Sequence, residues 1–280
     1  MVAPPVVSIG MPVFNSGRFL RGAISDLLTQ TFDDFELLIS DNHSTDDTWE
    51  LCQEIAAADL RVKLFRQDQN IGDLANFASV LKCATGKYFC WAADDDWHHS
   101  QFLQSTLAAL LSNRNAGLAF SAFSIFNHET GYKSEVMNPV ATSTSLLFEG
   151  LKSRFLNPVS NMFYGLMPTE FARRYFPHPY FDWGDAFMVA EISAYHDVEV
   201  VPLHLFGAGV KSTIRRPVAA NGIEISARTY RHKCIKLAFK VLPPHKALQL
   251  SRIVWRKCAE MDDETRRAEA QYRAYAQLKS

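Results

Sequence analysis

Three consecutive carboxylates, Asp94, Asp95 and Asp96, are the residues of this chain whose type and spacing point most directly to chemistry. They follow the apolar run of residues 88–91, which the pattern predicts to be a buried strand. Carboxylate oxygens are hard ligands suited to Mg²⁺ or Mn²⁺, and such an ion commonly binds the phosphates of a second ligand in its open positions. Runs of acids also occur in solvated turns and helix caps, so the cluster alone leaves both interpretations open.

The elements that would position this cluster alternate between strand-like and helix-like patterns. Strands are expected at residues 6–11, 35–40, 61–65, 86–91 and 117–126, and helices at residues 19–28, 73–84 and 101–111, with a further helix running through Ile55. Ser44 and Asp47 stand at the spacing of a capping box and predict where that further helix begins. The alternation predicts an α/β fold with a mainly parallel sheet flanked by helices.

Polar and aromatic residues cluster where these expected strands end. Pro12, Phe14, Asn15 and Asp41 fall on carboxyl ends of strands, as does the acidic cluster, although the set is spread over the first third of the chain. Ligands of open parallel sheets bind beyond the carboxyl ends of the strands. This convergence is the physical reason to expect a binding site there.

Composition limits the classes of protein to which the chain can belong. It has 280 residues, of which 48% are hydrophobic and 21% charged, and a net charge of −1. These values indicate a globular protein and argue against disorder or bulk attraction to nucleic acid. The five cysteines show no paired C-x-x-C spacing, which favours a reducing compartment, and we expect a cytoplasmic protein without a signal peptide or membrane span.

The charge is unevenly distributed. Nine Lys or Arg residues and no Asp or Glu lie between Ser226 and Cys258. A helical pattern returns in this region, with Pro243-Pro244 as a break. Two interpretations of residues 226–258 stay open, a solvated helical face or peripheral contact with anionic lipid at the inner face of a membrane.

Several motifs resemble those of the family 2 glycosyltransferases, well over residues 6–126 and loosely over residues 157–202. Met11 to Asn15 resembles the P-x-[YF]-N motif, and Asp41 to Thr48 resembles D-D-G-S-x-D-x-T. The segment that contains Asn70, Gly72 and Asn76 resembles N-x-G-x-x-x-A-x-N. Asn42 and His43 depart from the second motif, where relatives carry Asp and Gly.

The resemblance implies a GT-A fold, a Rossmann-like sheet that binds a nucleotide-sugar, joined to an acceptor-binding region. It implies a GT-A domain over residues 1–225, with a nucleotide-sugar-binding half at 1–127 and an acceptor-binding half at 128–225, followed by a helical basic C-terminal tail at 226–280. By resemblance, Asp41 accepts a hydrogen bond from the imide of uracil or a similar base, although an Asp there can also cap the next turn. The implied nucleotide-sugar-binding residues are Pro12, Val13, Phe14, Asn15, Asp41, Asn70, Gly72, Asn76, Asp94 and Asp95.

By the same resemblance, Asp94 to Asp96 corresponds to the D-x-D element that coordinates Mn²⁺ or Mg²⁺. Asp96 is the expected direct ligand, and Asp94 holds the metal, one of its waters or the ribose. Asp182 and Asp185 correspond to the segment in which inverting members carry their catalytic base, with Asp182 favoured. Either Asp can instead be the N-cap of the helix expected at residues 186–194.

The implied function is metal-dependent transfer of a sugar, with inversion at C1, from a nucleotide-diphosphate-sugar to a hydroxyl acceptor. A UDP-sugar is the favoured donor and a saccharide or lipid-linked molecule the acceptor, in cell-surface polysaccharide or glycan synthesis. No nucleic-acid partner is expected, and a homodimer is left open. The alternatives are a sugar-phosphate nucleotidyltransferase and a non-catalytic nucleotide-sugar-binding subunit of a polysaccharide assembly.

Overall fold

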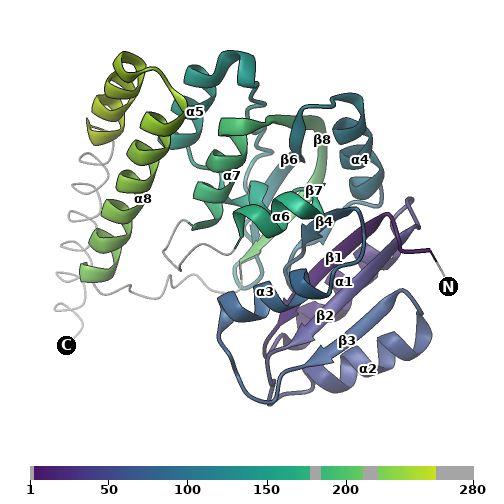
Figure 1. The fold of residues 1–280 in the computed structure, drawn as a ribbon. Coiled ribbons are helices and arrows are strands. Elements are labelled where there is room, and N and C mark those ends of the chain that lie inside the picture. Colours follow the sequence, from purple (N-terminus) through teal and green to yellow (C-terminus); the bar gives the residue numbers. More distant parts are fainter. Residues whose placement is uncertain (1–2, 177–183, 211–219, 257–280) are drawn as a thin grey trace.

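A five-stranded sheet forms one half of the fold (Figure 1), in a computed structural model that describes residues 3–176, 184–210 and 220–256. The strand order is β3-β2-β1-β4-β7, and all neighbours are parallel except the short edge strand β7. The strands are β1 (Val7–Val13), β2 (Phe35–Asp41), β3 (Val62–Arg66), β4 (Tyr88–Trp91) and β7 (Met167–Pro168). The mainly parallel sheet expected from the sequence is therefore confirmed.

A second sheet of three strands contains a long strand that the sequence did not predict. Its order is β5-β8-β6, with β5 (Trp97–His98) antiparallel and β6 (Ala116–Asn127) parallel to β8 (Asp197–Val210). Pro202 interrupts the apolar pattern, and the register is irregular there, because Val201 pairs with Ser121 and His204 with Ala122. A bulge of this kind lets proline sit within a strand.

Helices follow the strands of the first half in turn. The helix α1 (Leu20–Leu28) comes after β1, α2 (Thr48–Ala58) after β2, α3 (Asp73–Cys83) after β3 and α4 (Phe102–Ser112) after β5. In the second half lie α5 (Leu147–Leu156), α6 (Thr169–Tyr175), α7 (Gly184–Tyr195) and α8 (Ala220–Val241), with a last helix at residues 244–256. Short 3-10 turns lie at η1 (Gly17–Phe19), η2 (Thr144–Leu146) and η3 (Ser160–Tyr164). None of the helices in the described ranges is long and apolar enough to cross a membrane.

The beginning of α2 differs from the expected capping box. The helix starts at Thr48, and its N-cap Asp47 makes no side-chain cap hydrogen bond. Asp46 accepts instead from the Thr48 N–H at 3.1 Å. Ser44 bonds instead to Asp41 in the turn that precedes it, so Ser44 and Asp47 do not form the expected capping box.

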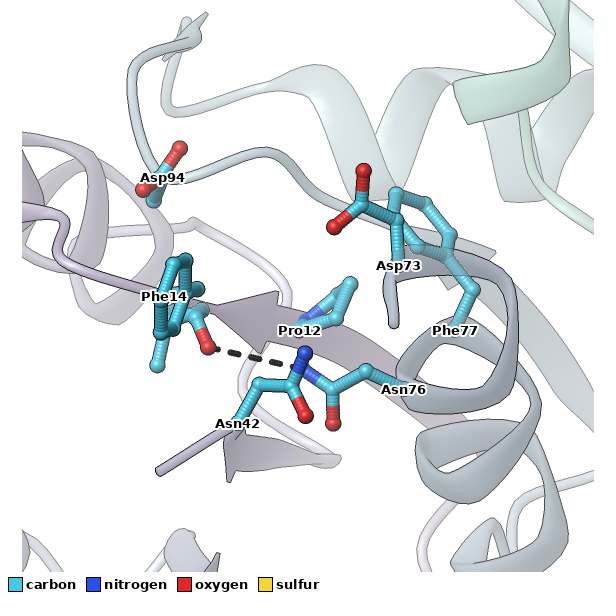
Figure 2. Close-up of a pocket in the computed structure, with 8 residues that line it drawn as sticks. Pro12, Phe14, Asn42, Asp73, Asn76, Phe77 and Asp94 are labelled. Atoms are coloured by element: carbon cyan, nitrogen blue, oxygen red, sulfur yellow. Dashed lines mark hydrogen bonds between the residues drawn. The ribbon is translucent and has the colours of Figure 1, made fainter. Parts of the chain in front are cut away.

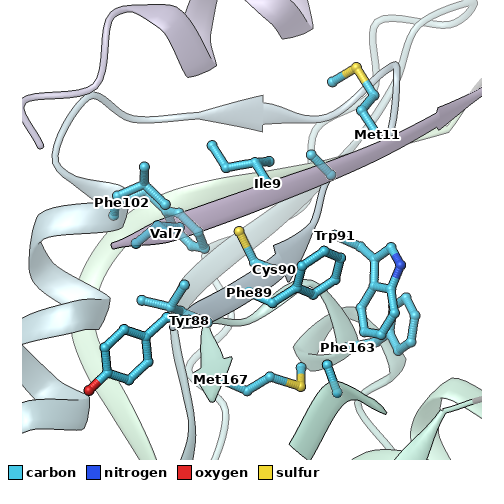
Figure 3. Packing of buried hydrophobic residues seen from close by; sticks show 14 of the residues in the cluster. Val7, Ile9, Met11, Tyr88, Phe89, Cys90, Trp91, Phe102, Phe163 and Met167 are labelled. Atoms are coloured by element: carbon cyan, nitrogen blue, oxygen red, sulfur yellow. The ribbon is translucent and has the colours of Figure 1, made fainter. Parts of the chain in front are cut away.

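The main core lies between the strands and the helices that cover them. Figure 3 shows Trp91 of β4 next to Phe163 of η3, whose rings stack at 4.3 Å between centroids. Phe89 contacts Trp91 edge-on at 4.7 Å. This aromatic group packs η3 directly against the strand that leads into the acidic cluster. Cys52 and Cys90 are also buried free thiols, and burial raises the pKa of each to about 12.

A second core joins α5, α7, α8 and the helix at 244–256. Figure 1 shows α8 and the last helix at one edge of the molecule, with α5 and α7 between them and the sheets. Phe155 of α5, Phe187 of α7, Leu237 of α8 and Leu250 of the last helix are all buried in this cluster. The domain boundary expected at residue 225 falls inside α8, so the expected tail shares its core with the region before it.

At the amino-terminal end of the first sheet, Glu36 is a buried carboxylate with several partners. It accepts hydrogen bonds from the Ser8 hydroxyl at 2.6 Å, from the Thr85 N–H at 2.9 Å and from the Thr85 hydroxyl at 2.7 Å, and it forms an ion pair with Lys63. Burial by itself would raise the pKa of Glu36, but the hydrogen bonds from Lys63, Ser8 and Thr85 outweigh it and hold the pKa below its usual value. One side chain thus links β1, β2, β3 and the loop before β4.

We expect Glu36→Gln to lower the free energy of unfolding by about 1.5–3 kcal/mol, because the variant loses charge-assisted hydrogen bonds. The folded pKa is depressed, so the stabilisation is complete above the unfolded pKa of about 4.3 and is lost as the pH falls through the lower folded value. Urea denaturation at pH 7 and at pH 3 measures both effects. The control Glu54→Gln removes an exposed carboxylate paired with Arg21. It should change neither the free energy of unfolding at pH 7 nor its dependence on pH. Equal stability of the Glu36 variant and wild type at pH 7 would contradict the role given to this network.

Candidate functional site

The loops after β1 and β2 are fastened to each other. The Asn15 N–H donates to the Ser44 hydroxyl at 2.9 Å, and the Thr45 N–H donates to Asn15 Oδ1 at 2.9 Å. The Asn42 N–H continues the pairing of the strands by donating to the Val13 carbonyl at 2.9 Å. Asn15 has a φ of 48°, in the left-handed region that Asn tolerates better than most residues. Two of the sequence motifs therefore form one structural unit.

Asp41 lies inside this unit. Its carboxylate is fully buried and accepts hydrogen bonds from the Ser44 N–H and hydroxyl, and the Arg66 Nε lies 3.2 Å from its Oδ2. This is the turn-capping arrangement that the sequence left open as an alternative. Asp41 is not among the residues that line the neighbouring cavity, and its contact with a nucleobase stays a prediction.

Asn70, Gly72 and Asn76 hold the loop and helix on the other side of the site. Asn70 Oδ1 accepts from Asn42 Nδ2 at 3.0 Å and from the Gly72 N–H at 2.9 Å. Gly72 has a φ of 83°, which a side chain would strain, directly before α3. Asn76 Nδ2 donates to the Ser40 carbonyl at 2.9 Å, so α3 is bonded to the end of β2.

A cavity of about 270 Å³ opens between these loops. It is lined by Pro12, Val13, Phe14, Asn42, Asp73, Asn76, Phe77 and Asp94. The structure thus brings together Pro12, Val13, Phe14, Asn76 and Asp94 of the predicted residues. Figure 2 shows Asp73 and Asp94 on two sides of the space next to Pro12. The Phe14 side chain is 40% exposed, which leaves part of its ring open to a ligand.

The acidic cluster forms a tight turn between β4 and β5, held from the second sheet. Asp96 Oδ1 accepts from the Gly209 N–H of β8 at 2.9 Å. His128 Nε2 lies 2.9 Å from the Asp95 carbonyl oxygen. A Cβ atom at position 209 would lie 2.1 Å from that same carbonyl oxygen, so only glycine permits this approach of the two backbones. The geometry of the acidic turn therefore depends on β8.

Asp96 is an incompletely satisfied buried carboxylate. Among the described residues its Oδ2 has no hydrogen-bond partner, although the atom is buried. Burial, together with the charges of Asp95 and Asp94, raises the pKa of Asp96 to about 8, against the opposing effect of the bond from Gly209. A divalent cation would neutralise this cluster and give the unpartnered oxygen a ligand, so the donor set fits Mn²⁺ or Mg²⁺.

The protein would supply only part of such a coordination shell. Over the described ranges, no three His, Cys, Asp or Glu side chains are grouped so that they could hold a metal ion. Mg²⁺ sites commonly complete their shell with water and substrate phosphates around one or two carboxylates. Asp96 and Asp94 suit a site of that kind.

Tyr164, at the end of η3, is influenced by charges of both the acidic turn and α7. Burial raises its pKa, as do the nearby charges of Asp96, Asp185, Asp95 and Asp94 in that order. Its ring stacks on Phe206 of β8 at 5.9 Å. Charges from the acidic turn and from the first turn of α7 therefore both act on this one phenol.

Asp185 is in the first turn of α7, and burial raises its pKa. The Ala186 N–H donates to its Oδ1 at 2.6 Å. A raised pKa suits a carboxylate that takes up a proton near neutral pH. Asp182, the favoured base, lies outside the described residues.

Several residues that matter for this geometry were not selected from the sequence, among them Asn42 and Phe77, which also line the cavity. Asp73 lines the cavity as the first residue of α3, and its position directly after the Asn70–Gly72 motif was a signal that could have identified it. Gly209 gave no such signal, because its role depends on a backbone more than a hundred residues away.

The fold and the arrangement of this site define an α/β class of protein with a cavity at the carboxyl ends of parallel strands, and comparison with known proteins narrows the class to a family. Residues 8–167 match the family described as glycosyl transferase family 2. Since the match spans more than half of the chain, the chain belongs to glycosyl transferase family 2. The mainly parallel sheet flanked by helices is that of GT-A glycosyltransferase structures.

Individual proteins resemble it to different extents. A Campylobacter jejuni protein named GalNAc(5)-diNAcBac-PP-undecaprenol beta-1,3-glucosyltransferase is 33% identical over 116 residues, covering 41% of this chain and 36% of its own. Staphylococcus aureus TarS 1–349 in complex with UDP-GlcNAc superposes with a TM-score of 0.68 at 16% identity, over 90% of this chain and 72% of that TarS 1–349 chain. The mannosyltransferase PcManGT from Pyrobaculum calidifontis, in complex with GDP-Man and Mn²⁺, superposes with a TM-score of 0.58 at 14% identity, over 99% of this chain and 81% of its own.

The curated relatives match over only part of their length, between 18% and 54%. The two structural similarities, both under 25% identity, show the shared fold.

We expect Gly209→Ala to destabilise the protein by about 1–3 kcal/mol, because the added methyl group forces β8 and the acidic turn apart. The matched control is Gly22→Ala in α1, where nothing lies within 4 Å of the added Cβ. That control should be neutral or stabilise by up to about 1 kcal/mol through helix propensity. Urea denaturation of both variants measures the difference, and a Gly209 variant as stable as wild type would mean that the turn does not need this approach.

Proposed function

We propose that this chain is a metal-dependent, inverting glycosyltransferase that transfers a sugar from a nucleotide-diphosphate-sugar to a hydroxyl acceptor. The observation that carries the proposal is the cavity at the carboxyl ends of β1 and β2, whose wall includes Asp94 and thus adjoins the acidic turn. A nucleotide in this cavity would have its diphosphate beside the carboxylates that fit a divalent ion. Membership of the family supports the same chemistry.

The nucleoside would lie against Phe14 and Pro12. Base–aromatic stacking contributes about 1–3 kcal/mol per base, and the partly exposed Phe14 ring offers such a surface. Asp73 and Asp94 present carboxylates to the cavity, and carboxylates accept hydrogen bonds from ribose hydroxyls. We propose a UDP-sugar as the donor, in line with the UDP-GlcNAc bound by TarS. The roles of Asn15, Asp41, Asn70 and Gly72 would be to fix the loops around the base.

Asp96 and Asp94 would hold Mn²⁺ or Mg²⁺, and the Mn²⁺ complex of the mannosyltransferase from Pyrobaculum calidifontis supports a cation in this fold. The ion would act as a Lewis acid that stabilises the negative charge of the departing nucleoside diphosphate. Asp95 contributes charge near the site, and its main-chain carbonyl fixes the turn through His128.

The acceptor hydroxyl would approach from the side of α7. Asp182 or Asp185 would remove its proton as the oxygen attacks C1 from the face opposite the leaving group, which inverts the configuration. The burial that raises the pKa of Asp185 supports that residue on physical grounds, whereas the sequence resemblance favours Asp182. Tyr164, within the influence of Asp96 and Asp185, would contact the sugar or the acceptor between them.

For the acceptor we propose a saccharide or lipid-linked saccharide in cell-surface glycan synthesis. The support is the relative from Campylobacter jejuni, whose name gives a diphospho-undecaprenol-linked acceptor. The two alternative functions, a sugar-phosphate nucleotidyltransferase and a non-catalytic subunit, would be recognised in the same assays. Release of pyrophosphate from a nucleoside triphosphate would indicate a nucleotidyltransferase, and donor binding without turnover would indicate a non-catalytic subunit.

We expect wild-type protein to bind UDP in calorimetry when Mn²⁺ is present, and to lose this binding when the metal is chelated. Asp96→Asn should weaken Mn²⁺-dependent binding by about 10–100-fold or more, the range found when the surroundings of a bound metal are altered. Asp68→Asn, at an exposed position after β3, is the matched control and should bind as wild type does.

The same titration with GDP in place of UDP shows which nucleobase the donor carries. Metal-independent binding in wild type and in Asp96→Asn would overturn the metal site while leaving the nucleotide pocket. Failure of both nucleotides to bind, with circular dichroism showing folded protein, would overturn the proposed function.

The catalytic general base is identified by comparing the kcat of Asp182→Asn with that of Asp185→Asn. Loss of a general base lowers kcat by about 10²–10⁴-fold, and UDP affinity should stay unchanged because a general base acts on the acceptor hydroxyl and not on the nucleotide. The variant with the larger loss of kcat marks the base, and the other serves as its control. Retention of full kcat by both variants would show that the base lies elsewhere.

A further inference from the structure

The helical pair at the edge of the molecule, α8 and the helix at residues 244–256, has one face inside the second core. Tyr230, Cys234 and Leu237 of α8 are buried, as are Ala247 and Leu250 of the last helix. Arg231 is also buried, with its guanidinium 4.0 Å from the centre of the Trp255 ring, and so joins the two helices. These contacts determine which side chains face outward.

The outward side chains are basic and apolar together. Phe239 is 50% exposed, Leu248 47% and Trp255 53%. Lys236, Lys240, Lys246, Arg252 and Arg256 are exposed on the same two helices. We call these eight residues the basic–aromatic face.

Their spacing places seven of them on two stripes, one on each helix, and Lys246 lies at the start of the last helix. Residues 236, 239 and 240 lie within about one turn of each other on α8, and residues 248, 252, 255 and 256 follow at helical spacing along the last helix. The sequence from Ser226 to Cys258 contains no Asp or Glu, so no acid within that stretch neutralises the basic residues.

A solvated basic face and a lipid-binding face differ in their apolar side chains. Single exposed hydrophobic residues are common and need no explanation. Here three large ones are interleaved with five cations, and Trp255 is braced by Arg231 with half of its surface still exposed. Interfacial helices combine basic residues with Trp, Phe and Leu, because the cations bind anionic headgroups while the apolar side chains enter the layer beneath.

We propose that the basic–aromatic face docks the protein on the surface of a membrane that contains anionic phospholipid. The face belongs to helices packed on α7 and α5, so docking would leave the nucleotide cavity next to β1 and β2 uncovered. If the acceptor is lipid-linked, as proposed above, it would be presented at this surface. The docking itself does not depend on that proposed function.

The test is cosedimentation of the full chain with two kinds of vesicle, one of phosphatidylcholine alone and one that also contains about 30% phosphatidylglycerol. The anionic lipid gives the second kind a negative surface that attracts basic residues. We expect binding to the anionic vesicles that weakens as salt rises. Each basic residue near an anionic surface contributes about fivefold in affinity, so Lys246→Gln/Arg252→Gln should weaken binding about 25-fold.

Two further variants separate the causes. Lys82→Gln/Arg114→Gln makes the same change in net charge at exposed positions on α3 and after α4, and should bind as wild type does. Leu248→Asn should weaken binding while leaving its salt dependence unchanged, because it removes apolar contact and no charge. Calorimetry with UDP and Mn²⁺ should give the same affinity for all three variants as for wild type.

Equal binding to both kinds of vesicle, no binding to either, or equal loss in the two double variants would overturn the proposal. Tighter binding to a single-stranded RNA than to anionic vesicles would also overturn it and assign the face to nucleic acid. Since UDP binding is measured separately, failure of the docking proposal and failure of the proposed function give different results.

Discussion

The site depends on one close approach between two backbones, that of Gly209 on β8 and the acidic turn after β4. The turn belongs to the loop that leaves the first sheet, and the strand belongs to the second sheet. This contact therefore sets the position of the carboxylates relative to both sheets. The hydrogen bond from the Gly209 N–H to Asp96 fixes one carboxylate oxygen, and the absence of a side chain at position 209 lets the strand reach the Asp95 carbonyl. His128 at the end of β6 braces the same carbonyl. The second sheet therefore acts as the support for a site that the first sheet supplies.

Three buried carboxylates show how the fold separates structural from ligand-binding groups. Glu36 and Asp41 are both surrounded by donors, which include Lys63 for the first and Arg66 for the second. Burying an ionised carboxylate is tolerable only when such partners replace the lost water. Asp96 accepts a hydrogen bond from the Gly209 N–H of β8 and has an unpartnered second oxygen among the described residues, beside two further acids. That imbalance favours a cation, and it lies at the edge of the nucleotide cavity.

The second half of the chain connects this site with the basic–aromatic face through α7, which contributes buried residues to both cores. Phe163 of η3 stacks on Trp91 directly before the acidic turn, and Tyr164 beside it contacts Phe206 of β8. The helix α7 packs on η3, on α5 and on α8. Asp185 and the residues proposed for docking are thus attached to the same helix layer, which would orient the site relative to a membrane surface.

The sequence by itself determined the parallel strands, the helices between them and the convergence of Pro12, Phe14 and the acidic cluster, because these follow from local periodicity and from the geometry common to parallel sheets. Only the tertiary structure decided that Asp41 turns inward to Ser44 and Arg66, that Asp73 enters the cavity, and that Gly209 supports Asp96. Local patterns cannot carry such information. Ser44 and Asp47 have the spacing of a helix cap, yet a neighbouring loop competes for Ser44 and α2 begins later. The pairing of β8 with β6 joins residues about eighty positions apart across a proline bulge, and its stabilisation comes from contacts that exist only once both sheets have formed.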